Sequence, residues 1–198
     1  MMMHRLSVAV VLFITLYFVS VFAVDWDVQT PLDDYVHRPD PAYEYYVLDI
    51  YDEDPDFTVH VLNMTSQKWM DETLTSRPIW FHMMGVAIPD VIQHDLAYMW
   101  IDGGSNGGGS GPEPPDDEKV LMIVELAERT GCVGAYIRQV PNQSMVFTND
   151  PNQEERSEDA IIAWTWYTFI KSHLDQPEVI LRMPMTKAAK RGHDAIDE

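Results

Sequence analysis

Two short apolar segments, separated by a glycine-rich loop and an amphipathic stretch, constrain the fold more than any other feature of this sequence. Leu96–Ile101 and Cys132–Ile137 each have the length and composition of a buried strand. The loop Gly103–Gly111 follows the first of them directly. A strand, a helix and a second strand in this order form a crossover unit, in which the two strands lie parallel in one sheet. The order therefore predicts an α/β fold.

The stretch between the two segments has the signals of an amphipathic helix. Asp116 or Asp117 can cap its first turn, and Gly131 can end it. Apolar residues recur between them at intervals of three and four, namely Val120, Ile123, Val124 and Ala127. We expect this helix to form the crossover.

The rest of the chain adds three expected strands and two expected helices. The strands are Tyr45–Ile50, Phe57–Asn63 and Pro78–Pro89. A helix is predicted over Ser157–His173, and its apolar residues surround so much of its circumference that we expect it to be deeply buried. A further helix begins near Thr186, whereas Thr30–Tyr43 has no regular pattern. Together these elements predict a mixed, mostly parallel sheet with flanking helices.

The glycine loop contains a literal G-x-S-x-G, centred on Ser105. In serine hydrolases this pattern marks a sharp turn from a strand into a helix, whose N-terminus faces the oxyanion. Here further glycines and a proline cluster precede any helix, so Ser105 is interpreted as a loop residue and not as a nucleophile. α/β-hydrolases place a loop that donates oxyanion-hole N–H groups ahead of the first crossover helix. Gly103 and Gly104 are candidates for that loop.

The charge of the chain restricts its partners. The sequence has 32 Asp and Glu residues and 13 Lys and Arg residues, a formal net charge of −19 at pH 7. Such a surface repels phosphate backbones, so we expect no binding to nucleic acid. The seven histidines show no metal-ligand spacing, and His82 is expected to be a hydrogen-bonded core residue. We predict no catalytic residue, no metal and no cofactor in this chain.

The N-terminal residues have the layout of a secretory signal peptide. Arg5 precedes the apolar run Leu6–Phe22, and small residues occupy the −3 and −1 positions of a cleavage site before Val24. Residues 1–23 are therefore predicted to be removed, and 24–198 to form the secreted domain. The apolar run is also long enough for an uncleaved membrane anchor, which stays open as an alternative.

Two further features bear on the secretory route. Asn63 and Asn142 each begin an N-x-S/T sequon and are candidate glycosylation sites. Cys132 is the single cysteine of the sequence, which excludes a disulfide within the chain. We expect it to be a buried small hydrophobic residue rather than a reactive thiol.

Several segments occur in an order that resembles a known family. Among them are Ser66–Trp69 (SQKW), Gly103–Asn106 (GGSN) and Pro184–Ala189 (PMTKAA). The sequence is similar to the PhoPQ-activated pathogenicity-related protein family, over nearly everything that follows the predicted signal peptide. The resemblance implies an α/β-hydrolase fold in which Gly103 and Gly104 border the oxyanion site. It also implies that the nucleophile, acid and histidine come from beyond residue 198.

The resemblance leads to two expectations. First, the chain should be an incomplete hydrolase-like fold, truncated before the nucleophile strand, so that Leu96–Ile101 lies at an open sheet edge that favours self-association. Second, since the family includes an autocrine repressor of proliferation, a non-enzymatic signalling or binding role is the alternative function. The substrate or receptor stays open in both cases.

Overall fold

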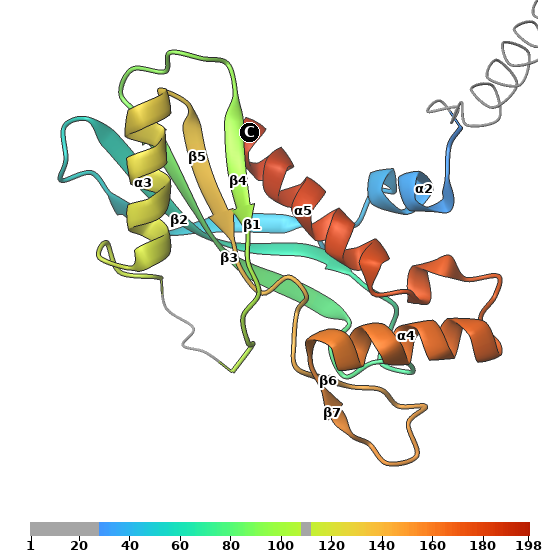
Figure 1. The fold of residues 1–198 in the computed structure, drawn as a ribbon. Coiled ribbons are helices and arrows are strands. Elements are labelled where there is room, and N and C mark those ends of the chain that lie inside the picture. Colours follow the sequence, from blue (N-terminus) through green and yellow to red (C-terminus); the bar gives the residue numbers. More distant parts are fainter. Residues whose placement is uncertain (1–27, 108–111) are drawn as a thin grey trace, which may run out of the picture. The chain divides into compact units, whose positions relative to one another are not determined.

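A computed structural model describes residues 28–107 and 112–198 (Figure 1). Residues Pro31–Glu198 form one compact unit. Its elements, in chain order, are α2 (Pro31–His37), β1 (Glu44–Tyr51), β2 (Phe57–Lys68), β3 (Ile79–Pro89), β4 (Ala97–Ile101), α3 (Glu118–Thr130), β5 (Val133–Ile137), β6 (Met145–Val146), β7 (Glu155–Arg156), α4 (Glu158–Ser172), the 3₁₀ turn η1 (Pro177–Val179) and α5 (Arg182–Asp197).

The long strands form one sheet in the order β1–β2–β3–β5–β4, and β6 pairs with β7 in a small separate ribbon. β4 and β5 run parallel, while the three other neighbouring pairs are antiparallel. The sheet is therefore mixed as predicted, but mostly antiparallel rather than mostly parallel. The connections explain the difference, because β1 to β2 and β2 to β3 are joined by links without a helix. The crossover helix α3 joins the parallel pair.

α3 has the boundaries that the sequence predicted. The side chain of Asp117 accepts a hydrogen bond from the Lys119 N–H at 2.8 Å, which caps the first turn. Gly131 ends the helix in a left-handed conformation, with φ +64°, and its N–H bonds to the Ala127 carbonyl. The helix buries its predicted stripe against the sheet through Val120, Ile123 and Ala127.

A close approach fixes α3 on the parallel pair. Tyr98 of β4 donates a hydrogen bond from its hydroxyl to the Ile123 carbonyl, at 2.8 Å. Gly134 of β5 lies beside this bond, and a Cβ placed there would lie 2.8 Å from the same carbonyl oxygen. Helix and strand therefore meet at a distance that excludes any side chain at position 134.

Two cores fill the faces of the sheet. The larger lies between the sheet, α5 and the inner side of α4, and it contains Trp69, Trp80 and Phe147. The Trp69 ring meets the Trp80 ring edge-on, with 5.6 Å between centroids. The smaller lies under α3 and contains Val59, Val61, Met83, Ala87, Val120, Ile123, Ala127 and Tyr136. Alternate residues of β2 and β3 point to the two cores, as the period of a strand requires.

The predicted strands are confirmed, but three expectations about other segments are wrong. Part of the segment expected to be irregular forms α2, which begins at Pro31 and carries Asp33 and Asp34 in its first turn. Cys132 is half-buried and precedes β5 rather than lying in it. α5 begins at Arg182, ahead of Thr186.

The predicted deep burial of α4 is also wrong. The helix buries Ile161, Thr165 and Thr168, while Trp166, Tyr167 and Ile170 are exposed. Because its apolar residues lie all round the helix, packing one side against the core leaves the opposite side in solvent. Figure 1 shows α4 beyond the end of the main sheet, near β6 and β7.

The predicted signal peptide, residues 1–23, lies outside the described residues, and so does its boundary with 24–198. None of the helices in residues 28–107 and 112–198 combines the length and the hydropathy of a membrane span.

Candidate functional site at the carboxyl end of β4

The glycine loop leaves β4 and continues alongside the segment that follows β5. The Asp102 N–H bonds to the Ile137 carbonyl at 2.8 Å, and the Val140 N–H bonds back to the Asp102 carbonyl at 3.1 Å. The Gln139 N–H bonds to the Gly103 carbonyl at 2.9 Å. The parallel pairing of the two strands is thereby extended into the loop, at the sheet edge where α/β folds bind ligands.

A second set of bonds ties the loop to β3. The Asn106 N–H bonds to the Gln143 carbonyl at 2.5 Å, and the Asn106 side-chain amide donates to Oδ1 of Asn142 at 3.0 Å. Asn142 in turn donates through Nδ2 to the Phe81 carbonyl, also at 2.5 Å. The buried Asn142 side chain therefore connects the loop with the central strand.

The two oxyanion candidates differ in their local geometry. The Gly103 N–H donates to Oδ1 of its neighbour Asp102 at 2.9 Å, so it is occupied. Gly104 has φ +125°, a conformation that glycine adopts readily, and nothing crowds a Cβ there closer than 3.7 Å. In the described ranges no acceptor is found for the Gly104 N–H. Backbone conformation, and not lack of space, therefore demands glycine at 104.

Charged groups surround the loop on the α3 side. Nζ of Lys119 lies 3.2 Å from a carboxylate oxygen of Asp102, and hydrogen bonds to Glu118 and Asp102 raise the Lys119 pKa. Glu113 forms an ion pair with Arg138 at 2.7 Å and accepts a bond from the Tyr136 hydroxyl at 3.3 Å. These pairs hold the residues before α3 against the ends of β4 and β5.

Ser105 lies where a nucleophile would not be activated. Its exposed hydroxyl accepts a hydrogen bond from the Gly107 N–H at 3.2 Å, which is a local turn contact. α3 begins only at Glu118, so Ser105 does not stand at the start of the helix that follows the strand. The interpretation of Ser105 as a loop residue is confirmed on these points.

A serine–histidine pair does exist, at a position that the sequence analysis missed. Oγ of Ser66 lies 2.9 Å from Nε2 of His82, whose Nδ1 lies 2.9 Å from the Arg138 carbonyl. Since a carbonyl only accepts, Nδ1 carries the proton and Nε2 accepts from the serine. Both side chains are fully buried, and this burial lowers the pKa of His82 to about 4.

The Ser66–His82 pair is structural rather than catalytic. No solvent reaches it, and a backbone carbonyl stands where a triad would have a carboxylate. His82 is the hydrogen-bonded core residue that the sequence predicted. The pairing escaped notice because a register shift in β2 between Thr65 and Gln67 turns two successive side chains inward.

The sequons lie in different surroundings. Asn63 is half-buried on β2. Asn142 is fully buried, and its Nδ2, the atom that would carry a glycan, donates to the Phe81 carbonyl. Glycosylation stays a prediction for both residues, and a glycan at Asn142 would require the loop anchor to open.

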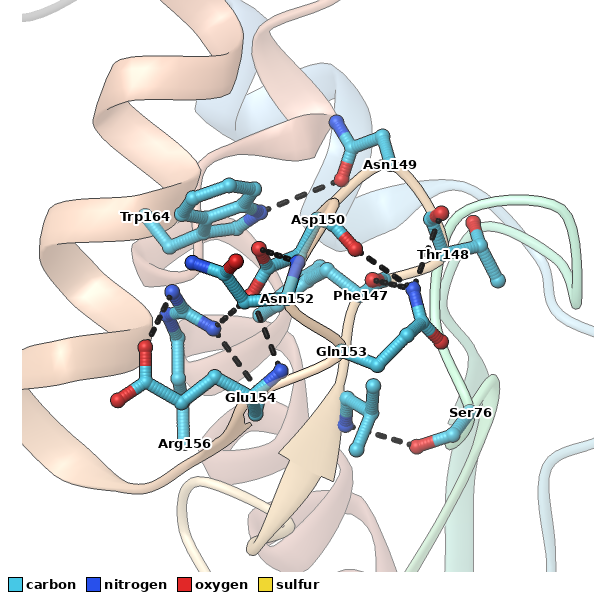
Figure 2. Close-up of polar contacts among 11 residues, drawn as sticks. Ser76, Phe147, Thr148, Asn149, Asp150, Asn152, Gln153, Glu154, Arg156 and Trp164 are labelled. Atoms are coloured by element: carbon cyan, nitrogen blue, oxygen red, sulfur yellow. Dashed lines mark hydrogen bonds and ion pairs between the residues drawn. The ribbon is translucent and has the colours of Figure 1, made fainter.

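A second polar cluster occupies the turn between β6 and β7 (Figure 2). Buried Asp150 accepts bonds from the Asn152 N–H at 2.9 Å and the Glu154 N–H at 3.1 Å, and pairs with Arg156 at 2.5 Å. The Asn152 N–H and Arg156 both lower the Asp150 pKa. Arg156 also lies over the Trp164 ring, 4.3 Å from its centroid. Trp164 also donates a hydrogen bond from Nε1 to Oδ1 of Asn149 at 3.3 Å, so its ring and its N–H together hold the turn against α4.

The comparisons with known proteins agree with the sequence resemblance. The sequence model of the PhoPQ-activated pathogenicity-related protein family matches residues 32–198, which are nearly all of the described residues. The chain belongs to this family. A curated family relative, the autocrine proliferation repressor protein A of Dictyostelium discoideum, is 36% identical over 169 residues. The match covers 85% of this chain and 32% of the relative, so the chain spans about a third of the relative's length.

Solved structures give a more distant likeness. Two chains of a glucuronoyl esterase from Solibacter usitatus align with TM-scores of 0.30 and 0.29 at 13% identity. Each alignment covers 77% of this chain and 45% of the esterase chain. At this level of similarity the esterase supports no further argument about the family member described here.

Proposed function

We propose that this chain forms the first part of a hydrolase-type sheet, and that its glycine loop borders the oxyanion site of an acyl-transfer enzyme. The observation that carries the proposal is the attachment of the loop. Bonds at Gln139, Asn106 and Asn142 hold the loop on both sides of Gly104 at the carboxyl end of β4, in the connection that leads to the crossover helix. Oxyanion stabilisation requires this kind of backbone, fixed before the reaction begins.

The proposal assigns no nucleophile to the described residues. A fluorophosphonate reacts with an activated serine and leaves unactivated hydroxyl groups intact. We expect the 198-residue chain to remain unmodified, as measured by intact mass after treatment. Labelling at Ser105 would overturn this assignment, because it would mean that the loop serine has a base.

The role of the loop is tested in the longest product of the gene that encodes this sequence. Valine at position 104 cannot easily adopt φ +125°, so Gly104→Val should turn the N–H away from the oxyanion. Loss of one oxyanion donor lowers kcat by about 10² to 10³, with little change in KM, for hydrolysis of p-nitrophenyl esters. Gly107→Ala is the matched control, since its Cβ meets nothing closer than 3.6 Å. Equal kcat in both variants would contradict the oxyanion role.

A second candidate function is non-enzymatic signalling, favoured by the printed name of the curated relative. In this case the purified chain, unlabelled by fluorophosphonate, slows the growth of the cells that produce it. Gly104→Val should leave that effect intact, because no oxyanion is involved. A loss of both growth effect and ester hydrolysis in the same variant would instead favour the enzyme.

Secretion is part of both proposals. We expect the material recovered from the culture medium to begin at or near Val24, as determined by N-terminal sequencing. Recovery in the membrane fraction with an intact N-terminus would favour the anchored form.

A further inference from the structure

The asparagine of the glycine loop is followed by a glycine, and this pair has a chemistry of its own. Asn106 precedes Gly107, whereas the other asparagines of the sequence precede Met64, Gln143, Asp150 and Gln153. In an Asn-Gly pair the glycine nitrogen can attack the side-chain carbonyl carbon of the asparagine, because the glycine has no Cβ in the way and its backbone turns freely. Asn106 is therefore the asparagine of this chain at which the sequence most favours such a reaction.

Gly107 is free to act as the nucleophile. It is exposed, it lies outside the helices and strands, and its N–H donates to the Ser105 hydroxyl at 3.2 Å rather than to a strand partner. A bond of this kind in an exposed turn opens at little cost in free energy. The Gly107 nitrogen is thus not held away from Cγ of Asn106 by regular structure.

The side chain of Asn106 is anchored through its nitrogen. Nδ2 donates to Oδ1 of Asn142, and the Asn106 N–H bonds to the Gln143 carbonyl. Rotation of the side chain toward Gly107 therefore requires the loop to open locally. Oδ1 of Asn106 favours opening, since it is buried without a hydrogen-bond partner in the described part of the chain and gains water when the loop opens.

We propose that Asn106 is a site of spontaneous deamidation, and that the reaction detaches the glycine loop from β3 for good. In the opened loop the Gly107 nitrogen loses its proton to water or hydroxide and forms a bond to Cγ of Asn106. The side-chain nitrogen takes up a proton and leaves as ammonia, which gives a cyclic imide. Water then opens the imide, either at Cγ to give aspartate or at the main-chain carbonyl to give isoaspartate. The balance is one water consumed and one ammonia released, with no oxidant or cofactor.

Neither product can replace Asn106 in the anchor. A carboxylate only accepts hydrogen bonds, and the atom that it would face, Oδ1 of Asn142, is also an acceptor. If Asn142 turned its amide round, it would lose the bond from Nδ2 to the Phe81 carbonyl. A charge buried without a donor is costly, so the modified loop stays open beyond Gly104. The reaction itself does not depend on the oxyanion role of the loop.

The first experiment follows the mass of the 198-residue chain, made in a bacterial host that adds no glycan. The folded protein is incubated at neutral and at mildly alkaline pH, and its peptides are weighed over time. We expect a gain of about one dalton in the peptide that contains Asn106, faster at the higher pH because the attacking nitrogen must lose its proton. The peptides with the other asparagines should keep their masses.

Gly107→Ala is the matched variant. A Cβ at this position meets nothing closer than 3.6 Å, so the loop is kept while the closure of the ring is hindered. The rate at Asn106 should fall roughly tenfold or more. No mass gain at Asn106, or an equal rate in Gly107→Ala, would overturn the proposal.

A second comparison tests the detachment of the loop. Asn106→Asp reproduces one product, and Asn149→Asp makes the same exchange at an exposed side chain whose Oδ1 already accepts a bond from Trp164. Hydrogen exchange at the residue-106 amide, corrected for intrinsic rates, should be at least about tenfold faster in Asn106→Asp and unchanged in Asn149→Asp. Equal exchange in the two variants would show that the loop stays attached, and this part of the proposal would fail.

Discussion

Helices α4 and α5 differ in burial, and the difference is the reverse of what their compositions suggest. α4 is rich in aromatic and aliphatic residues, yet it buries two threonines and leaves Ile170 61% exposed. α5 is polar, yet it lies in the core and buries Lys187 to 2% exposure. The difference shows that the pattern of a helix along its faces, and the partners that the fold supplies, decide burial more than mean hydropathy does.

Lys187 is buried against two groups that stabilise its charge. Its Nζ lies 3.3 Å from Asp40, in the segment between α2 and β1, and 5.0 Å from the centre of the Tyr35 ring. Asp40 also accepts bonds from the Lys68 and Ala42 N–H groups. Burial lowers the Lys187 pKa, and the charge of Asp40 acts against this shift. On α4, by contrast, the buried polar side chains among the described residues are the uncharged Thr165 and Thr168.

Removal of the charge partner of Lys187 should have the largest effect on stability. Asp40→Asn keeps the shape but leaves the lysine charge buried without its counterion, at a cost of about 3–5 kcal/mol. Urea denaturation measures the loss. Asp194→Asn is the control on the same helix, where Lys190 and Arg191 are more exposed and the cost is about 0–1 kcal/mol. Similar losses in the two variants would mean that burial of Lys187 is not what stabilises α5.

The next effect concerns the buried polar groups beside the start of α5. Gln67 donates to the Pro184 carbonyl at 2.7 Å and to Ser66, which bonds His82. The His82 pKa is lowered from 6.5 to about 4, so the unfolded chain binds more protons in this window. The contribution of neutral His82 to the free energy of unfolding is complete above pH 6.5 and decreases as the pH falls. Below pH 4 the free energy of unfolding is lower by about 3 kcal/mol. The measurement is the free energy of unfolding against pH, and His82→Gln should flatten this part of the curve.

A smaller effect distinguishes the two threonines on the inner side of α4. The Thr165 hydroxyl accepts from the Leu181 N–H at 3.2 Å and donates to the Ile162 carbonyl. Thr165→Val leaves a buried N–H unpaired and should cost about 1–3 kcal/mol. The Thr168 hydroxyl is buried without a partner among the described residues, so Thr168→Val should be neutral or stabilising. Thermal melting of both variants checks the order, and a reversed order would refute this account of α4.

The smallest effect is expected on the outer side of α4. Ile170→Lys exchanges an exposed apolar residue for a charged one and should change the free energy of unfolding by less than about 0.5 kcal/mol. A loss of 2 kcal/mol or more in urea would show that this side is covered in solution, which would remove the contrast with α5.

Features that depend on residues close together in the sequence were predicted correctly, whereas features that depend on distant segments were not. α3 was located to within one residue, because the capping aspartates at 116 and 117 and Gly131 are local signals. The burial of α4 and Lys187 depends on segments far away in the chain, such as Asp40, and no local pattern contains that information. The strand order depends likewise on which links carry a helix.

The candidate site was predicted in part. The position of Gly103 and Gly104 after a strand and ahead of a crossover helix could be derived, because both elements are local. Their anchoring by Asn142 could not, since Asn142 was recognisable only as a sequon. The pairing of Ser66 with His82 was missed because the β2 bulge breaks the alternation on which strand faces are assigned.

If the chain enters the secretory pathway as predicted, glycosylation and folding compete for the side chain of Asn142. An oligosaccharyltransferase needs the amide nitrogen free, whereas the finished fold engages it at Phe81. Folding of the loop and glycosylation of Asn142 exclude each other. A chain in which this region folds first is not glycosylated there, and a chain that is glycosylated first cannot form the bond that anchors its glycine loop. The fraction of chains that carry a glycan at Asn142 would then measure how soon β3 and the loop come together during folding.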